Sequence, residues 1–375
     1  MGGTPAATPE LLEETLKVLA ENGGNISAAA ESIGVSRCTF ASRVYRARST
    51  PIPPEETFRI KGTSTLYDPD GNVKIEWVKT EVDKERAEAL AKVAILALME
   101  GIKPTPKTPS PKKTDSDLLV ALMIGDAHLG CYAWGDQCSG GSTDTDIASR
   151  DLILAADRLI ASTPDAGEGL IVNLGDWFHA DNLASTTTAG TTLDTDGRRA
   201  RTVRIGVQVL RHIVSKALEK FKTVRLRNVK GNHDQNAGLI LDEAMRAFYA
   251  KDPRFILEDT PADLFIHRFG TNLIGITHGH NVKMEALPGV LAVDAREHWS
   301  DCEFRYIWTG HVHNRRCIEA METLCESFRT LQSNDKWHSD KGYRSQKEMV
   351  AIVLDRNYGE VERHTAGLKR VRAGQ

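Results

Sequence analysis

Residues 118–130 read LLVALMIGDAHLG, an apolar run of strand length that ends in glycine, aspartate and histidine. Four later stretches repeat this pattern of a hydrophobic run followed by polar residues. They are GLIVNLGDWFHAD (169–181), VRLRNVKGNHD (224–234), NLIGITHGHN (272–281) and FRYIWTGHVHN (304–314). Functional groups gather at the carboxyl ends of strands in open α/β folds, so we expect all five segments to converge on one crevice.

Helical spacing separates the first three of these runs. Apolar residues recur with helical periodicity over 147–160 and 201–221, whereas the later runs are less clearly separated by helices. We therefore predict an α/β fold in which a mixed, two-layered sheet sandwich is flanked by helices, in preference to a purely parallel sheet.

The polar residues that follow the runs are suited to binding divalent metal ions. They are Asp126, His128, Asp176, Asn232, His233, His278, His280, His311 and His313. Carboxylates, an amide oxygen and imidazoles suit manganese, iron or zinc, and the lack of cysteine at these points argues against a structural zinc site. A carboxylate is the natural bridge between two ions, and Asp176 is the candidate.

This set of side chains predicts phosphoester hydrolysis. A water bridging two ions would be acidified to hydroxide and attack phosphorus in line. His233 would protonate or stabilise the departing oxygen. The alternative is that these residues are ordinary polar side chains of loops or hydrogen-bonded buried groups. That interpretation would be preferred for one isolated histidine, but not for the whole set.

The order of the motifs GDAH, GD, GNHD, HGH and GHVH closely resembles the calcineurin-like metallophosphoesterase family, over roughly residue 118 to the end of the chain. The resemblance implies three groups of ligands: Asp126, His128 and His313 for a first divalent ion, Asp176 as the bridge, and Asn232, His278 and His311 for a second. Manganese is the preferred ion, with iron or zinc as alternatives. The resemblance also implies that His233 faces the scissile phosphate without binding metal, with Asp234 orienting it.

Several residues near the motifs have no assigned role. His179 stands where many relatives have a carboxylate. The first histidine of the HGH pair is the usual ligand, so His280 is left to support the ligands from behind. Cys131 and Cys138 are interpreted as ordinary thiols in preference to ligands. In the C-terminal segment, the sequence does not decide whether Trp337, His338 and Tyr343 shape the pocket or simply pack.

Residues 25–49, NISAAAESIGVSRCTFASRVYRARS, are typical of a helix-turn-helix. A helix over 8–22 precedes them, and a tight turn at 34–36 leads into a second helix over 37–48. That helix carries four arginines and no acid, which predicts DNA binding: Arg37, Arg43, Arg46 and Arg48. A solvated basic helix in an ordinary small bundle is the alternative.

The remaining segments complete the domain organisation. Two strand-like runs around DPDGN predict a hairpin over 58–80, helical spacing follows over 83–99, and a stretch rich in proline and lysine predicts a linker. The expected parts are a helix-turn-helix domain (1–50), a hairpin and helix module (51–101), a linker (102–117) and a metallophosphoesterase domain (118–375).

Composition restricts the possible partners. The net charge of −3 over 375 residues argues against a protein that coats nucleic acid with its whole surface, so we expect any DNA contact to be local. Six scattered cysteines without a CxxC pair favour reduced thiols. No apolar run is long enough to span a bilayer and no signal peptide pattern opens the chain, so a soluble cytoplasmic protein is expected.

The leading hypothesis is a metal-dependent phosphodiesterase that acts as a DNA nuclease, similar to the repair-nuclease branch of the family. Its domain combination also resembles proteins carried by bacteriophages. One alternative is a phosphatase or phosphodiesterase on nucleotides or phosphoproteins. Another is a non-catalytic DNA-binding regulatory protein, against which the complete ligand set argues.

Overall fold

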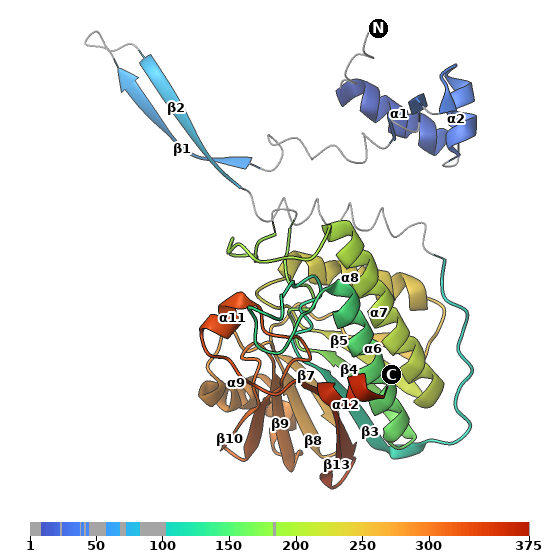
Figure 1. Cartoon of the computed structure of the whole chain (residues 1–375), viewed down its shortest axis with the longest axis vertical. Helices are drawn as coiled ribbons and strands as arrows, with labels where there is room; N and C mark the ends of the chain where they lie inside the picture. Colours follow the sequence, from blue (N-terminus) through green and yellow to red (C-terminus); the bar gives the residue numbers. More distant parts are fainter. Residues whose placement is uncertain are drawn as a thin grey trace. The chain divides into compact units, whose positions relative to one another are not determined.

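The computed structural model describes residues 9–22, 25–37, 39–40, 43–44, 58–67, 73–82, 103–182 and 185–374. The chain divides into two compact units, Met1–Ala91 and Lys92–Gln375 (Figure 1). Among the described residues, no helix is both long and apolar enough to cross a bilayer.

The N-terminal unit contains a small helical core. Helix α1 (Pro9–Glu21) is followed by α2 (Ile26–Ser32), whose first turn is capped by the side chain of Asn25. Gly34 turns the chain with a positive φ of 67°, and the hydroxyl of Ser36 accepts a hydrogen bond from Thr39 N at 3.0 Å. Apolar side chains from both sides of this turn pack together: Leu19, Ala29, Ala30, Phe40 and Val44.

A hairpin of two antiparallel strands, β1 (Phe58–Tyr67) and β2 (Val73–Val82), follows in the same unit. The strands lie where the sequence predicts a hairpin. The DPDGN turn and the helix expected over 83–99 lie outside the described residues.

The C-terminal unit contains two sheets. The first has the order β13-β12-β3-β4-β5-β6, in which β3 to β6 run parallel and β12 is antiparallel to both of its neighbours. Its strands are β3 (Asp115–Ile124), β4 (Ala166–Asn173), β5 (Thr223–Asn228), β6 (Phe255–Leu257), β12 (Glu348–Asp355) and β13 (Gly359–Gly367). The second has the order β10-β11-β9-β8-β7, with β8, β9 and β11 parallel. Its strands are β7 (Phe265–Phe269), β8 (Asn272–Ile276), β9 (Phe304–Thr309), β10 (Arg316–Ala320) and β11 (Thr323–Ser327).

Helices cover both outer faces of the two sheets. Those on the first sheet are α6 (Thr145–Ser162), α7 (Arg199–Lys220), α8 (Gln235–Tyr249) and α12 (Leu368–Ala373). Those on the second are the 3-10 turn η1 (Met284–Ala286), α9 (Leu287–Asp294) and α10 (Arg296–Trp299). A short helix, α11 (Lys336–Asp340), precedes β12.

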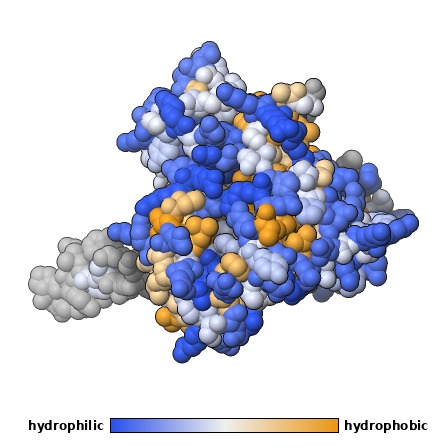
Figure 2. Space-filling model, turned by 90° about the horizontal axis from the view of Figure 1, so that it is seen from below, coloured by the Kyte–Doolittle hydropathy of each residue, from blue (hydrophilic) through white to orange (hydrophobic). Residues whose placement is uncertain are grey.

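The alternation of side chains along β3 explains these layers. Leu119 and Met123 join the apolar core between the two sheets, whereas Val120 and Leu122 join the core beneath α6, α7 and α8. Successive side chains of a strand point to opposite faces, so a strand that is apolar at every position is buried on both sides. The structure therefore confirms the mixed two-sheet sandwich flanked by helices. On the face shown in Figure 2, hydrophobic residues form separate small patches among hydrophilic ones.

Candidate metal centre

The parallel strands bring the predicted motifs to one edge of the sandwich. In the first sheet, Ile124 pairs with Asn173, and Asn173 pairs with Asn228, so the loops carrying GDAH, GD and GNHD begin side by side. In the second sheet, Ile276 pairs with Trp308, which places the HGH and GHVH loops next to each other.

The first cluster consists of Asp126, His128 and His313, whose donor atoms all lie within 4.8 Å of one another and are buried. The Nε2 atoms of the two histidines are 3.0 Å apart, and His313 Nε2 lies 3.8 Å from Asp126 Oδ1. Two imidazole nitrogens that bind one ion at about 2.1 Å are separated by roughly 3.0 to 3.4 Å at octahedral or tetrahedral angles. The two rings therefore fit one ion between them.

The second cluster consists of Asp176, His278 and His311. His278 Nε2 lies 3.2 Å from Asp176 Oδ2 and 3.1 Å from Asn232 Oδ1, while its Nδ1 donates to the carbonyl of Leu174 at 2.7 Å. A neutral ring that donates through Nδ1 carries a lone pair on Nε2, which here faces two oxygen acceptors. A positive charge at this point, either a proton on Nε2 or a bound cation, satisfies these acceptors.

The pKa values of two buried residues also indicate a position for a positive charge. Burial lowers the pKa of His278, but the carboxylates of Asp176 and Asp126 outweigh it and raise the pKa to about 9. At neutral pH a proton on His278 Nε2 therefore supplies positive charge next to Asp176, at the point where a bound metal ion would supply it. Burial raises the pKa of Asp126 to about 7, although His278 opposes this shift. Buried carboxylates become acidic again when a metal ion supplies the missing positive charge.

One oxygen of Asp176 lies between the two clusters. Oδ2 is 3.2 Å from His278 Nε2 and 3.9 Å from His128 Nε2, whereas Oδ1 accepts a hydrogen bond from His233 N at 2.8 Å. Burial raises the pKa of Asp176, but the charge and hydrogen bond of His278 lower it by a larger amount. The net shift of the pKa is therefore downward. The side chain expected to bridge thus presents a single oxygen to both clusters.

Backbone strain is concentrated at the predicted ligands. Among the described residues, eight non-glycine residues have positive φ, and five of them are predicted ligands: Asp126 (32°), His128 (42°), Asp176 (50°), His311 (69°) and His313 (54°). Left-handed backbone at such residues costs on the order of 1–3 kcal/mol each and is typically retained where function requires it. This distribution favours a functional centre over a set of ordinary loops.

The glycines of the motifs allow the loops to approach closely. A Cβ on Gly231 would overlap the carboxylate of Asp176, and a Cβ on Gly310 would lie 2.7 Å from Asp126 Oδ2. At Gly175, which has a φ of 100°, it would lie 2.5 Å from His278 Nδ1. Each glycine therefore provides space for a predicted ligand from another loop.

His233 lies beside the two clusters and is half-buried. Its Nδ1 is 2.8 Å from the carbonyl oxygen of His179, so the ring donates there and presents Nε2 elsewhere. Asp234, expected to orient this ring, is buried and accepts a hydrogen bond from Phe178 N at 2.9 Å through Oδ2. The carbonyl of His179, and not Asp234 as expected, therefore orients the ring of His233. Asp234 instead binds the loop that carries the GD motif, through Phe178 N.

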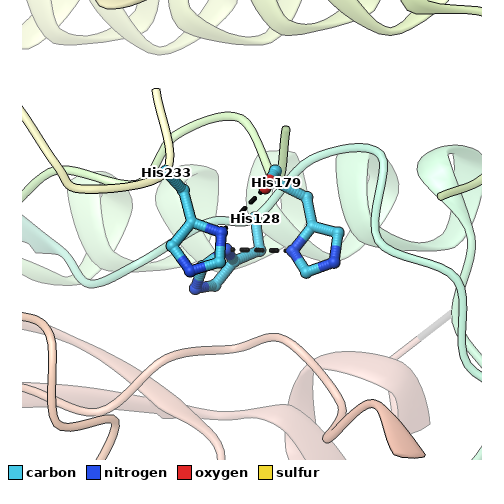
Figure 3. Close-up of side chains that lie close together, drawn as sticks. All are labelled: His128, His179 and His233. Carbon is cyan, nitrogen blue, oxygen red and sulfur yellow. Dashed lines mark hydrogen bonds between the residues drawn. The ribbon is translucent and has the colours of Figure 1, made fainter. Parts of the chain in front are cut away.

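His179 contacts a predicted ligand, which the motif pattern did not indicate. Its Nδ1 lies 3.3 Å from His128 Nδ1, and Figure 3 shows His128 next to both His179 and His233. If His128 binds metal through Nε2, its single proton resides on Nδ1 and is donated to His179. The proton of His179 must then reside on Nε2, which is buried, has no hydrogen-bond partner among the residues that the structure describes, and lies close to Asp335 and Cys131.

This proton arrangement predicts different effects for two amide substitutions. In His179→Asn the side-chain oxygen can take the position of Nδ1 and accept from His128, whereas in His179→Gln the amide extends towards the position of Nε2. We expect His179→Gln to weaken metal binding about 10- to 100-fold, and His179→Asn to retain most of it. Competition titration with a chromophoric chelator measures both; equal affinities for the two variants would contradict the assignment.

The other uncertain residues occupy varied positions. The ring of His280 is tilted against His278 with centroids 5.2 Å apart. Cys131 and Cys138 are buried free thiols. Cys131 lies near His179 and Asp335.

Sequence reasoning gave no role to His338 and Asp335. The ring of His338 stacks on His313 with centroids 4.9 Å apart, and its Nδ1 lies 2.7 Å from Asp335 Oδ1. Their segment contains no metal-binding motif, so only the tertiary structure reveals that they adjoin the first cluster.

The predicted DNA-binding residues are described only in part. Arg37 is exposed and Arg43 is half-buried, on backbone that is helical at both positions. Arg46 and Arg48 lie outside the described residues.

Comparisons with known proteins give weak likenesses. No family model and no curated protein sequence matches the chain. Among solved structures it is similar to a predicted phosphoesterase from Streptococcus pneumoniae TIGR4, at 13% identity over 67% of this chain and 98% of that one, with a TM-score of 0.28. It is also similar to zinc-complexed Vps29 from Entamoeba histolytica (15% identity, 66% and 99% coverage, TM-score 0.29) and to Vps29 from Cryptosporidium parvum (16%, 68% and 97%, 0.30). These likenesses are too weak to assign a family or an activity.

Proposed function

We propose that this protein is a divalent-cation-dependent phosphodiesterase that hydrolyses nucleic acid, with DNA as its substrate. The observation that carries the proposal is the pair of adjoining clusters that share Asp176 Oδ2. Asp126, His128 and His313 would hold one ion, and Asn232, His278 and His311 the other. Their buried carboxylates and inward-facing lone pairs fit manganese, iron or zinc.

The site residues have separable tasks in this reaction. Divalent ions bound at such a site lower the pKa of a water molecule and neutralise charge on phosphoryl oxygens. Asp176 holds the two clusters together, and the carbonyl of His179 fixes the ring of His233. His233 then presents Nε2, through which a protonated ring donates to the departing oxygen.

Selective restoration of activity tests the proposal. Protein stripped with chelator is assayed on bis(4-nitrophenyl) phosphate, 4-nitrophenyl phosphate, single-stranded DNA and duplex DNA, before and after manganese, iron(II) or zinc is added. We expect no turnover without metal, restoration by manganese, and cleavage of DNA. Preference for the monoester would indicate a phosphatase instead. Metal binding without any hydrolysis would indicate a non-catalytic DNA-binding protein.

The N-terminal unit is proposed to bind DNA through its basic helix. We expect Arg37→Ala and Arg43→Ala to weaken DNA binding, and each to reduce the slope of log K against log salt by about 0.9 if it removes one phosphate contact. Binding isotherms at several salt concentrations measure this slope. Lys17→Ala, on the exposed side of α1, is the matched control and should leave the slope unchanged. Unchanged slopes in both arginine variants would count against this interface.

A further inference from the structure

Exposed aromatic side chains gather on two segments of the C-terminal unit. Among the described residues, the exposed ones are Tyr132, Trp134, Trp337, Tyr343 and Tyr358. All except Tyr358 belong to segments 131–142 and 333–343, which contact each other. Ser139 N donates to Ser339 Oγ at 2.9 Å, and Ser333 Oγ donates to the carbonyl of Gly140 at 3.0 Å.

A chain of ring contacts connects this surface to the first metal cluster. His338 stacks on His313, Trp337 meets His338 edge-on with centroids 4.9 Å apart, and Tyr343 contacts both Trp337 and His338. We call Trp337, His338 and Tyr343 the aromatic ledge. Trp337 is therefore one ring removed from a predicted metal ligand, while 57% of its surface is exposed.

The ledge is held in place by its own hydrogen bonds. Asp335 caps α11 by accepting from His338 N at 2.8 Å, and the same oxygen lies 2.7 Å from His338 Nδ1. Asn334 Nδ2 donates to the carbonyl of Tyr343 at 2.7 Å. A large aromatic side chain that is fixed in position and exposed beside a reactive centre is suited to stacking on a flat ligand.

The charge near the ledge favours an anionic ligand. Segment 335–347 carries four basic and two acidic side chains. Lys336 is paired with Asp340, and Asp335 is engaged by His338. Segment 131–142 adds one acid, Asp136, and no base, so four basic side chains stand against three acidic ones and the surface keeps a small net positive charge.

We propose that the aromatic ledge stacks on an unpaired nucleobase adjacent to the scissile phosphate, so that the substrate is a single strand or a frayed end. The inference rests on the proposed phosphodiesterase function. Trp337 is exposed and lies one ring away from the predicted ligand His313, and aromatic side chains stack on any base. Within a duplex a base is already stacked on both faces, so it must leave its neighbours to reach Trp337.

Paired substrates test the ledge. The full-length protein is assayed on a single-stranded thymidine oligomer and on an oligomer of equal length with abasic sugars. We expect a preference in kcat/KM of roughly 5- to 150-fold for the base-bearing oligomer, which corresponds to the usual strength of one base–aromatic stack. Trp337→Ala should remove most of this preference, and Trp337→Phe should retain part of it.

Tyr358→Ala is the matched control. Tyr358 follows β12 at Asp355, which pairs with Leu118 near the start of β3, whereas the ledge adjoins loops at the opposite ends of these strands. This variant should keep the wild-type preference.

The outcomes separate the ledge from the proposed function. Hydrolysis of both oligomers at equal rates, or a preference unaffected by Trp337→Ala, would overturn the ledge and leave the phosphodiesterase standing. If no diester is hydrolysed with any metal, the proposed function fails. In that event, quenching of tryptophan fluorescence by the thymidine oligomer, compared between wild type and Trp337→Phe, still tests base stacking, and identical quenching would overturn it.

Discussion

Asp176→Asn is expected to lower kcat on a phosphodiester at least about a thousandfold, because it removes the negative charge from the oxygen that lies between the two clusters, where the proposed ions would need several kcal/mol of charge stabilisation. Asp176 Oδ2 lies 3.2 Å from His278 Nε2 and 3.9 Å from His128 Nε2. A carboxamide has nearly the same shape but no negative charge. The variant should therefore bind fewer divalent ions while keeping the fold.

The amide is chosen because it separates function from folding. Its oxygen can still accept the hydrogen bond that His233 N donates to Asp176 Oδ1 at 2.8 Å. Metal content by mass spectrometry and kcat on bis(4-nitrophenyl) phosphate are compared with those of Asp157→Asn, which changes a surface carboxylate paired with His212. A variant at position 176 that keeps two ions and the wild-type kcat would remove the basis of the two-metal proposal.

Much of the fold follows from local patterns. The uninterrupted apolar run of β3 predicts burial on both faces, and its side chains do divide between two cores. The helices expected over 147–160 and 201–221 are α6 (Thr145–Ser162) and α7 (Arg199–Lys220). These features depend on residues close together in sequence, where periodicity is informative.

The pairing of distant strands could not be predicted in the same way. Strand β12 inserts beside β3 in antiparallel direction, although the two segments lie at opposite ends of the unit's sequence. β11 joins β9 in parallel after the intervening β10. Such long-range pairing is set by which hydrophobic faces remain uncovered, and a local pattern does not contain that information.

The same distinction applies to the site. The residues expected as ligands each follow an apolar strand, and parallel pairing brings the ends of those strands together. His179 and Asp335 depend instead on contacts between loops. The contact between His179 Nδ1 and His128 Nδ1 shows which ring nitrogen of His179 faces the predicted ligand. The sequence motif does not contain this information.

His233 offers the sharpest test of the chemical step. We expect His233→Asn to reduce kcat roughly 10²- to 10⁴-fold on DNA, whose leaving alkoxide needs a proton, which is the usual contribution of a positioned general acid. Asparagine retains an N–H that can donate to the His179 carbonyl, so the loop keeps its contact, but the side chain cannot transfer a proton.

A change of leaving group distinguishes proton donation from a structural role. On bis(4-nitrophenyl) phosphate the leaving phenolate departs without a proton, so His233→Asn should cost less than about tenfold there. His212→Asn, which alters a surface histidine paired with Asp157, should affect neither substrate. If His233→Asn instead slowed both diesters by the same factor, the ring would act through position or charge and not as the acid. The proton on the leaving oxygen would then have to come from elsewhere in the site.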